Sequence, residues 1–149
     1  MTDHYVLIGQ TPVPEPDLLT WARWMEGNRR VAFTRLPWCH VSTVFLGLDH
    51  SFRPGAEPVL FESMTFWPAD GGYEQERCST WLEAEAMHKH MVAEASQPAV
   101  IMRSLWRLLW NRLEAAADDW RRAWREQRGI PLSEWEAGLD RIRKLSPEV

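Results

Sequence analysis

The side chains best suited to chemistry in this chain are acids and histidines near the ends of apolar segments. Asp49 and His50 directly follow VSTVFLGL (41–48), an apolar run that predicts a central β-strand. Ligand-binding groups often lie where a strand ends, and a carboxylate beside an imidazole could orient a general base or hold a metal ion. The alternative is structural, because Asp and His next to Ser51 are also common where a strand passes into a turn.

Glu62 and His88 are the second pair of candidates. Glu62 shares the apolar side of a predicted strand (59–66) with Met64, so its carboxylate is either paired, for example with Arg35, or placed at the rim of the sheet, or used in acid/base chemistry. His88 lies at the border of the apolar face of a predicted helix. A pocket between sheet and helix would then be formed by Asp49, His50, Glu62 and His88.

The cysteines and the remaining histidines give little indication of a metal site or a nucleophile. Cys39, His40, Cys78 and His88 could form a zinc site, but no two of them have C-x₂-C or H-x₃-H spacing. Cys39 and His40 are adjacent on a predicted strand, so their side chains point to opposite faces. The chain has no Gly-rich phosphate loop, no G-x-S-x-G and no H-E-x-x-H. We therefore expect no catalytic residue, no metal and no cofactor.

These candidates are positioned by four predicted strands. Apolar runs predict strands at 5–8, 31–36, 41–48 and 59–66. Prolines at 12, 14 and 16 forbid continuation of the first strand. Asp70-Gly71-Gly72 predicts a turn or a longer loop, with no strand between it and the next helix.

Two helices complete this first domain, which we place at residues 1–97. Asp17 opens a helix with apolar residues at i, i+3, i+4 and i+7. Thr80 and Glu83 have the spacing of a capping box at the start of a second helix, which runs to about Glu94. Its expected core face consists of Ala84, Met87 or His88, Met91 and Ala95. The order β-α-β-β-β-α predicts an α+β fold, with a small antiparallel sheet of about four strands and helices on one face.

Residues 98–149 predict a helical extension. Pro98 suits the first turn of a helix, and Gly129 suits its end. A second, shorter amphipathic helix follows, so the extension should be an αα-hairpin. One stripe of the long helix carries four tryptophans with Leu113 and Ala117 between them; the tryptophans are Trp106, Trp110, Trp120 and Trp124.

Four indoles on one side of a helix are expected to pack against another apolar surface, because removing indole surface from water lowers the free energy substantially. The sequence leaves three alternatives for the surface that covers these indoles: the second face of the protein's own sheet, a second copy of the chain, or a partner protein. Tryptophan is enriched at interaction hot spots, so these four residues form our predicted interface.

Composition and charge limit the classes of partner. The chain has 149 residues and a net charge of −4; residues 1–97 carry a net −6 and residues 98–149 a net +2. This balance disfavours nucleic acid and anionic lipid as partners. No segment is apolar and long enough to span a bilayer, and the N-terminus lacks the pattern of a signal peptide. With only two cysteines, the simplest expectation is a cytoplasmic, reduced protein.

Three segments in this order resemble a group of small uncharacterised proteins encoded in bacteriophage and prophage genomes: VSTVFLGLDHSF (41–52), LFESMTF (60–66) and STWLEAEAMH (79–88). The likeness extends over roughly residues 4–92 and includes TPVPEPDLLTWARWM (11–25). It implies a protein made inside a bacterial host cell and carries no activity with it. The helical extension lies outside the resemblance.

Two hypotheses follow from the sequence. The first is a non-enzymatic phage or prophage accessory protein that binds another protein, such as a host or defence component, or self-associates. The second is a small enzyme or ligand-binding protein whose pocket is formed by Asp49, His50, Glu62 and His88.

Overall fold

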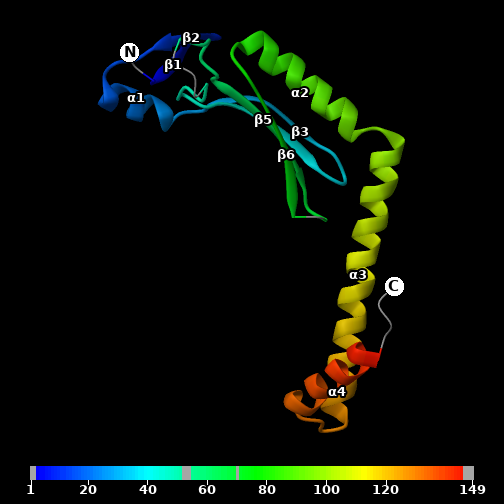
Figure 1. The fold of residues 1–149 in the computed structure, drawn as a ribbon. Coiled ribbons are helices and arrows are strands. Elements are labelled where there is room, and N and C mark those ends of the chain that lie inside the picture. Colours follow the sequence, from blue (N-terminus) through cyan, green and yellow to red (C-terminus); the bar gives the residue numbers. More distant parts are fainter. Residues whose placement is uncertain (1–2, 52–54, 70, 146–149) are drawn as a thin grey trace. The chain divides into compact units, whose positions relative to one another are not determined.

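Six strands and four helices form the described chain. Figure 1 presents the computed structural model, which describes residues 3–51, 55–69 and 71–145, with side chains described up to residue 138. The elements are β1 (Tyr5–Ile8), β2 (Thr11–Pro14), α1 (Leu18–Met25), β3 (Arg30–Arg35), β4 (His40–Phe45), β5 (Phe61–Trp67), β6 (Gly72–Cys78), α2 (Trp81–Ala95), α3 (Pro98–Gln127) and α4 (Leu132–Leu145). The chain divides into two compact units, Met1–Arg107 and Leu108–Val149, so the boundary lies within α3.

A two-stranded hairpin, β1–β2, precedes the main sheet. The sequence predicted β1 but not β2, since prolines are poor strand formers. Pro12 pairs with Leu7 and Pro14 with Tyr5, two positions on the same side of β2. Among the described strands β2 pairs with β1 alone, so a proline nitrogen that faces away from β1 removes no ladder hydrogen bond. Gly9, at φ 64°, supplies the left-handed residue of the turn.

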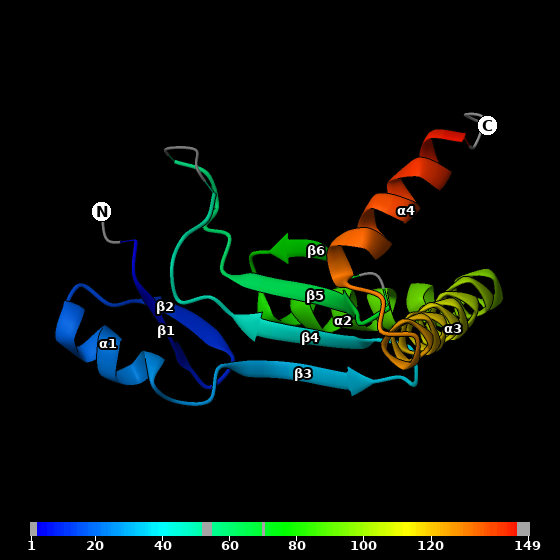
Figure 2. The ribbon, with the colours of Figure 1, turned by 90° about the horizontal axis from the view of Figure 1, so that it is seen from below.

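The main sheet is a four-stranded antiparallel meander in the order β3-β4-β5-β6, which Figure 2 shows side by side. Gly71 lies in a turn, as the sequence predicted for this segment, but β6 begins at Gly72, where the sequence predicted no strand. Its sequence, GYEQERC, has no apolar alternation and its first six residues are exposed, so the usual signal of a strand is missing. Pairing with β5 over the full length of both strands determines its conformation. The α+β class and the antiparallel sheet are confirmed.

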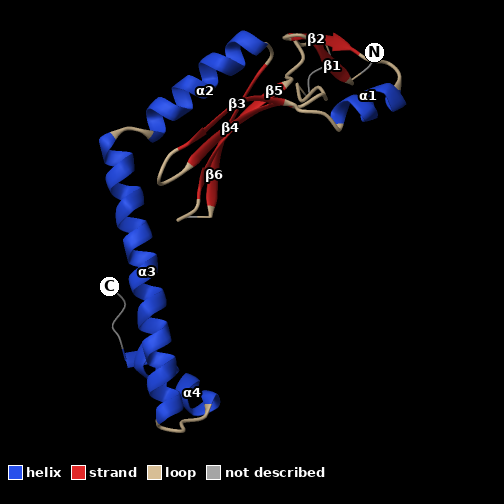
Figure 3. Ribbon diagram, turned by 180° about the vertical axis from the view of Figure 1, so that it is seen from behind, coloured by secondary structure: helices blue, strands red, loops and turns tan. Residues whose placement is uncertain are grey.

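Helix α2 covers one face of this sheet (Figures 1 and 3). Phe45, Phe61, Leu60 and Ala84 form one buried cluster, and Val41 packs with Met87 and Met91 in a second. Each large apolar side chain buried in this way contributes about 1.5–3 kcal/mol. The expected core face of α2 is confirmed, with Ala84, Met87, His88, Met91 and Ala95 buried.

The predicted start of α2 has a physical cause. The Thr80 side chain accepts a hydrogen bond from the Glu83 backbone, and the Glu83 carboxylate accepts one from the Thr80 backbone at 2.9 Å. This reciprocal capping box is the one that the sequence predicted. Helix α2 ends at Ala95, and α3 begins three residues later at Pro98.

The second unit contains the C-terminal part of α3, followed by α4. Helix α3 ends at Gln127, and Gly129, at φ 65°, lies in the turn that follows it. The Trp124 and Trp135 rings lie 5.9 Å apart between centroids, and the Arg128 guanidinium lies 4.4 Å from the centre of the Trp124 ring. Two helices are therefore present as expected, while their packing as an αα-hairpin stays a prediction.

Candidate functional site

Asp49 organises the chain that follows β4. Its carboxylate accepts hydrogen bonds from the backbone N–H of Ser51 at 2.8 Å and of Val59 at 3.0 Å, and from the Ser51 hydroxyl at 3.0 Å. Burial alone would raise the pKa of Asp49, but the bonds from Ser51 and Val59 outweigh it and lower the pKa. The His50 backbone N–H donates to the Val59 carbonyl at 3.0 Å. These contacts match the turn that the sequence allowed as the alternative at this position.

Glu62 is paired with an arginine on the neighbouring strand. Its carboxylate accepts from Arg77 Nε at 2.8 Å and from Gln75 Nε2 at 2.8 Å. Glu62 and Arg77 stand directly opposite each other in the β5–β6 register. Opposite charges in that arrangement stabilise a sheet. The suggested partner Arg35 is on β3, and the actual partner lies on the strand that the sequence did not predict.

His88 is the centre of a buried polar network. Its Nε2 lies 2.9 Å from Thr34 Oγ1, and its Nδ1 lies 2.8 Å from Thr43 Oγ1. Thr43 Oγ1 is in turn 2.5 Å from Ser63 Oγ. Burial lowers the pKa of His88, so the neutral imidazole is favoured. Through Thr34, Thr43 and Ser63 this network joins α2 to three strands of the sheet. Among the described residues every buried side-chain nitrogen and oxygen has a hydrogen-bond partner, so the network is fully satisfied.

The structure does not bring the four predicted pocket residues together. His88 bonds to Thr43, whose side chain points toward α2, whereas Glu62 stands opposite Val44, the next residue along β4. Because successive side chains alternate across a strand, Glu62 and His88 lie on opposite faces of the sheet. Asp49 bonds within the segment after β4.

Two of the zinc ligands considered from the sequence, His40 and His88, lie on opposite faces of the sheet. His40 stacks on Phe66, with ring centroids 4.7 Å apart, on the face opposite His88. Burial raises the pKa of Cys78 to about 11 and also raises the pKa of Cys39. Both thiols are therefore held protonated, which makes them poor nucleophiles and poor metal ligands.

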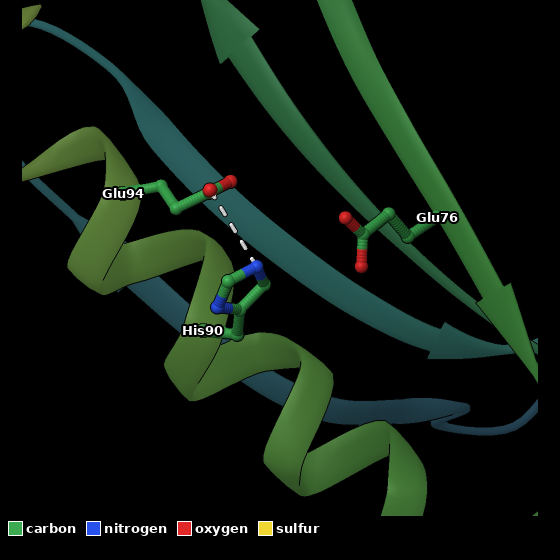
Figure 4. A group of neighbouring side chains, drawn as sticks. All are labelled: Glu76, His90 and Glu94. Atoms are coloured by element: carbon green, nitrogen blue, oxygen red, sulfur yellow. Dashed lines mark ion pairs between the residues drawn. The ribbon is translucent and has the colours of Figure 1, made fainter.

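A different group has the spacing of metal ligands. Within the described residues, Glu76, His90 and Glu94 each offer one ligand atom, and these atoms lie within 4.8 Å of one another. Figure 4 shows His90 and Glu94 on α2 with Glu76 facing them from β6. All three side chains are exposed. This group was not predicted from the sequence, although the i, i+4 spacing of His90 and Glu94 is visible there.

The predicted indole face is exposed along most of its length. Relative exposure is 66% for Trp106, 52% for Trp110 and 67% for Trp120. Trp124 is half-buried, because Trp135 and Arg128 contact its ring. Leu113, between these residues on the same stripe, is 55% exposed. Large apolar side chains therefore face solvent at several consecutive turns of α3.

Comparison with known proteins gives no relative: neither a family model, nor a curated protein, nor a solved structure matches this chain. None of the described helices has the length and apolar character needed to cross a membrane.

Proposed function

We propose that this protein acts through protein–protein contact made by the exposed indole face of α3, and that it is a phage or prophage accessory protein working in the cytoplasm of the bacterial host. The observation that carries the proposal is the exposure of Trp110, Leu113 and Trp120 on one helix. Monomeric proteins seldom leave such a contiguous apolar surface in water unless it binds something. Tryptophan is the residue most typical of binding hot spots. The phage context rests on the sequence resemblance alone.

A second copy of the chain is the occupant that the spacing of this face favours. Positions 110, 113, 117 and 120 read Trp, Leu, Ala, Trp, and their spacing of 3, 4 and 3 is the same in both directions. An antiparallel pair of α3 helices would therefore place Trp110 opposite Trp120 of the other copy and Leu113 opposite its Ala117. A large residue against a small one allows the helices to interdigitate, and such self-complementarity is what a two-fold interface requires.

The exposed apolar area of this face is comparable to what a dimer interface of standard size requires. At roughly 200 Å² per indole, Trp110 and Trp120 together offer about 240 Å² of exposed apolar surface. A standard interface buries about 800 Å² per partner, of which about 60% is apolar. The two indoles thus supply about half of the apolar share, and neighbouring leucines add to it. Leu109 and Leu113 are 50% and 55% exposed.

Light scattering coupled to size exclusion tests the proposal. We expect the wild-type chain to be dimeric at micromolar concentration and the double variant Trp110→Ala/Trp120→Ala to be monomeric. Alanine is a better helix former than tryptophan, so the variant should keep α3 helical. The matched control is Leu82→Ala, which removes a side chain that is 76% exposed on α2 and should leave the dimer intact.

Two outcomes would contradict self-association: a wild-type chain that stays monomeric at all concentrations, or a double variant that remains dimeric. If the wild type is monomeric, specific capture of a host protein by the wild type and not by the double variant would mean that the indole face binds that protein and not a second copy of the chain.

The alternative from the sequence, a ligand pocket at Asp49, His50, Glu62 and His88, gains no support from the geometry. Asp49 and Glu62 are occupied by structural hydrogen bonds, and His88 is enclosed in a satisfied network.

A further inference from the structure

Acidic side chains gather where the edge strand β6 meets α2. The residues of β6 that pair with Thr65 and Ser63, whose side chains are buried beneath α2, are Glu74 and Glu76. Glu76 therefore points toward the α2 side of the sheet, and Figure 4 shows its carboxylate directed at His90 and Glu94. No lysine or arginine in the described part of the chain forms an ion pair with Glu76. Negative charge is thus concentrated here without a basic side chain to balance Glu76.

The geometry of this group is close to that of a coordination shell. His90 Nε2 and Glu94 Oε1 lie 3.6 Å apart. Two tetrahedral ligands, each about 2.0–2.1 Å from a zinc ion, lie about 3.4 Å apart. Glu76 is within 4.8 Å of both, and rotation of its exposed side chain can close the remaining gap. Two ligands one helical turn apart on α2 and a third on β6 would then meet one ion.

The site also adjoins a hollow. A surface pocket shares Glu94 with the group, and its lining residues are Trp67, Glu74, Glu94, Gln97, Val100 and Arg103. Three protein ligands leave one or more coordination positions for water or a small anionic ligand.

We propose that Glu76, His90 and Glu94 bind one divalent transition-metal ion of the Zn²⁺ class. One imidazole and two carboxylates form a nitrogen–oxygen donor set that suits zinc and its neighbours, whereas magnesium and calcium prefer oxygen donors alone. The ion neutralises the carboxylates and connects β6, the outermost strand, to the helix that covers the sheet. Metal binding therefore stabilises the folded first unit, because the three ligands are brought together only in that fold.

Isothermal titration of the full chain with ZnCl₂, after removal of metal by a chelator, tests the site. We expect one equivalent of Zn²⁺ to bind, and His90→Ala to abolish that binding. Glu76→Gln and Glu94→Gln should each weaken it by at least about tenfold. The control Glu57→Gln removes an exposed carboxylate outside the site and should leave the affinity unchanged.

Thermal unfolding provides a second readout. A hundredfold excess of Zn²⁺ over its dissociation constant should raise the Tm of the first unit by about 10–20 °C and leave the Tm of His90→Ala unchanged. All three ligands are exposed, so the metal-free variants should unfold at nearly the wild-type temperature. The proposal is overturned if the wild type takes up no Zn²⁺, if His90→Ala binds it equally well, or if Mg²⁺ binds as tightly as Zn²⁺.

Discussion

Helices α2 and α3 are neighbours in the sequence, yet their apolar faces differ in what they contact. Apart from His88 and the first residue, Trp81, the contact face of α2 consists of small or flexible side chains, and Ala84, Met91 and Ala95 are at most 4% exposed. Alanine allows the helix to approach the sheet closely, and methionine fills what space remains. The apolar face of α3 carries indoles instead, and Trp110 and Trp120 remain more than half exposed.

This difference indicates which surface each helix packs against. The face of α2 is matched by large residues on the strands beneath it, namely Phe45 and Phe61, so large and small side chains complement each other within the chain. The face of α3 offers the large side chains itself. We infer that its complement is supplied by another chain.

The largest expected effect is on the α2 side. Phe61→Ala removes a ring that is completely buried between the sheet and α2, and should lower the free energy of unfolding of the first unit by about 3–5 kcal/mol. Trp120→Ala, on α3, should change that free energy by no more than about 0.5 kcal/mol. Urea denaturation followed by far-UV circular dichroism measures both. Equal destabilisation by the two substitutions would remove the distinction between the helices.

A smaller effect is expected at the polar network beneath α2. His88→Leu removes the hydrogen-bond partner of the Thr34 hydroxyl and one of the partners of the Thr43 hydroxyl. We therefore expect a loss of about 1–3 kcal/mol in the free energy of unfolding. His88→Asn, which can still bond to one threonine, should recover part of this loss.

His88 should also make the wild type sensitive to acid. Because the pKa of His88 is lowered in the folded state, protons bind more readily to the unfolded chain once the pH falls below the ordinary histidine pKa of about 6.5. Stability is therefore present above that pH and declines as the pH falls toward the lowered pKa. Denaturation curves at several pH values should show a shallower decline for His88→Leu than for the wild type. Parallel declines would mean that His88 is not the group responsible.

The smallest expected effect is at the start of α2. Thr80→Ala removes the hydroxyl that caps the helix, and should cost about 1 kcal/mol in the free energy of unfolding. Thr80→Ser keeps an equivalent hydroxyl and should cost less. If both variants are as stable as the wild type, the packing of α2 on the sheet determines its stability and the capping box adds nothing.

The sequence predicted those parts of the fold whose signals are local. The capping box at Thr80 and Glu83 and the apolar run at 41–48 are both readable over a few residues. The capping box is present in the structure, and the apolar run overlaps the strand His40–Phe45. β2 and β6 were missed because neighbouring strands determine their conformation. Pro12 and Pro14 are acceptable only at a free edge, and GYEQERC forms a strand because β5 provides its hydrogen-bonding partner.

The candidate pocket needed information that the sequence lacks. Glu62 was recognised as a carboxylate in need of a partner, but the identity of that partner depended on β6, which was not predicted. His88 was recognised at the border of the helix face, while its threonine partners come from strands that lie 54 and 45 residues away in sequence. The group of Glu76, His90 and Glu94 likewise depends on β6, since no local pattern places Glu76 near α2.

Cysteine cross-linking across α3 tests the central contrast most directly. Two chains, one with Leu113→Cys and one with Ala117→Cys, are co-expressed with tags of different size and oxidised mildly. An antiparallel pair predicts a disulfide-linked heterodimer, with little cross-linking between identical variants. Arg112→Cys, about 120° around the helix from the stripe, serves as the control and should remain uncross-linked, as should the native Cys39 and Cys78. Absence of the heterodimer, or equal cross-linking through Arg112→Cys, would contradict pairing through the indole face.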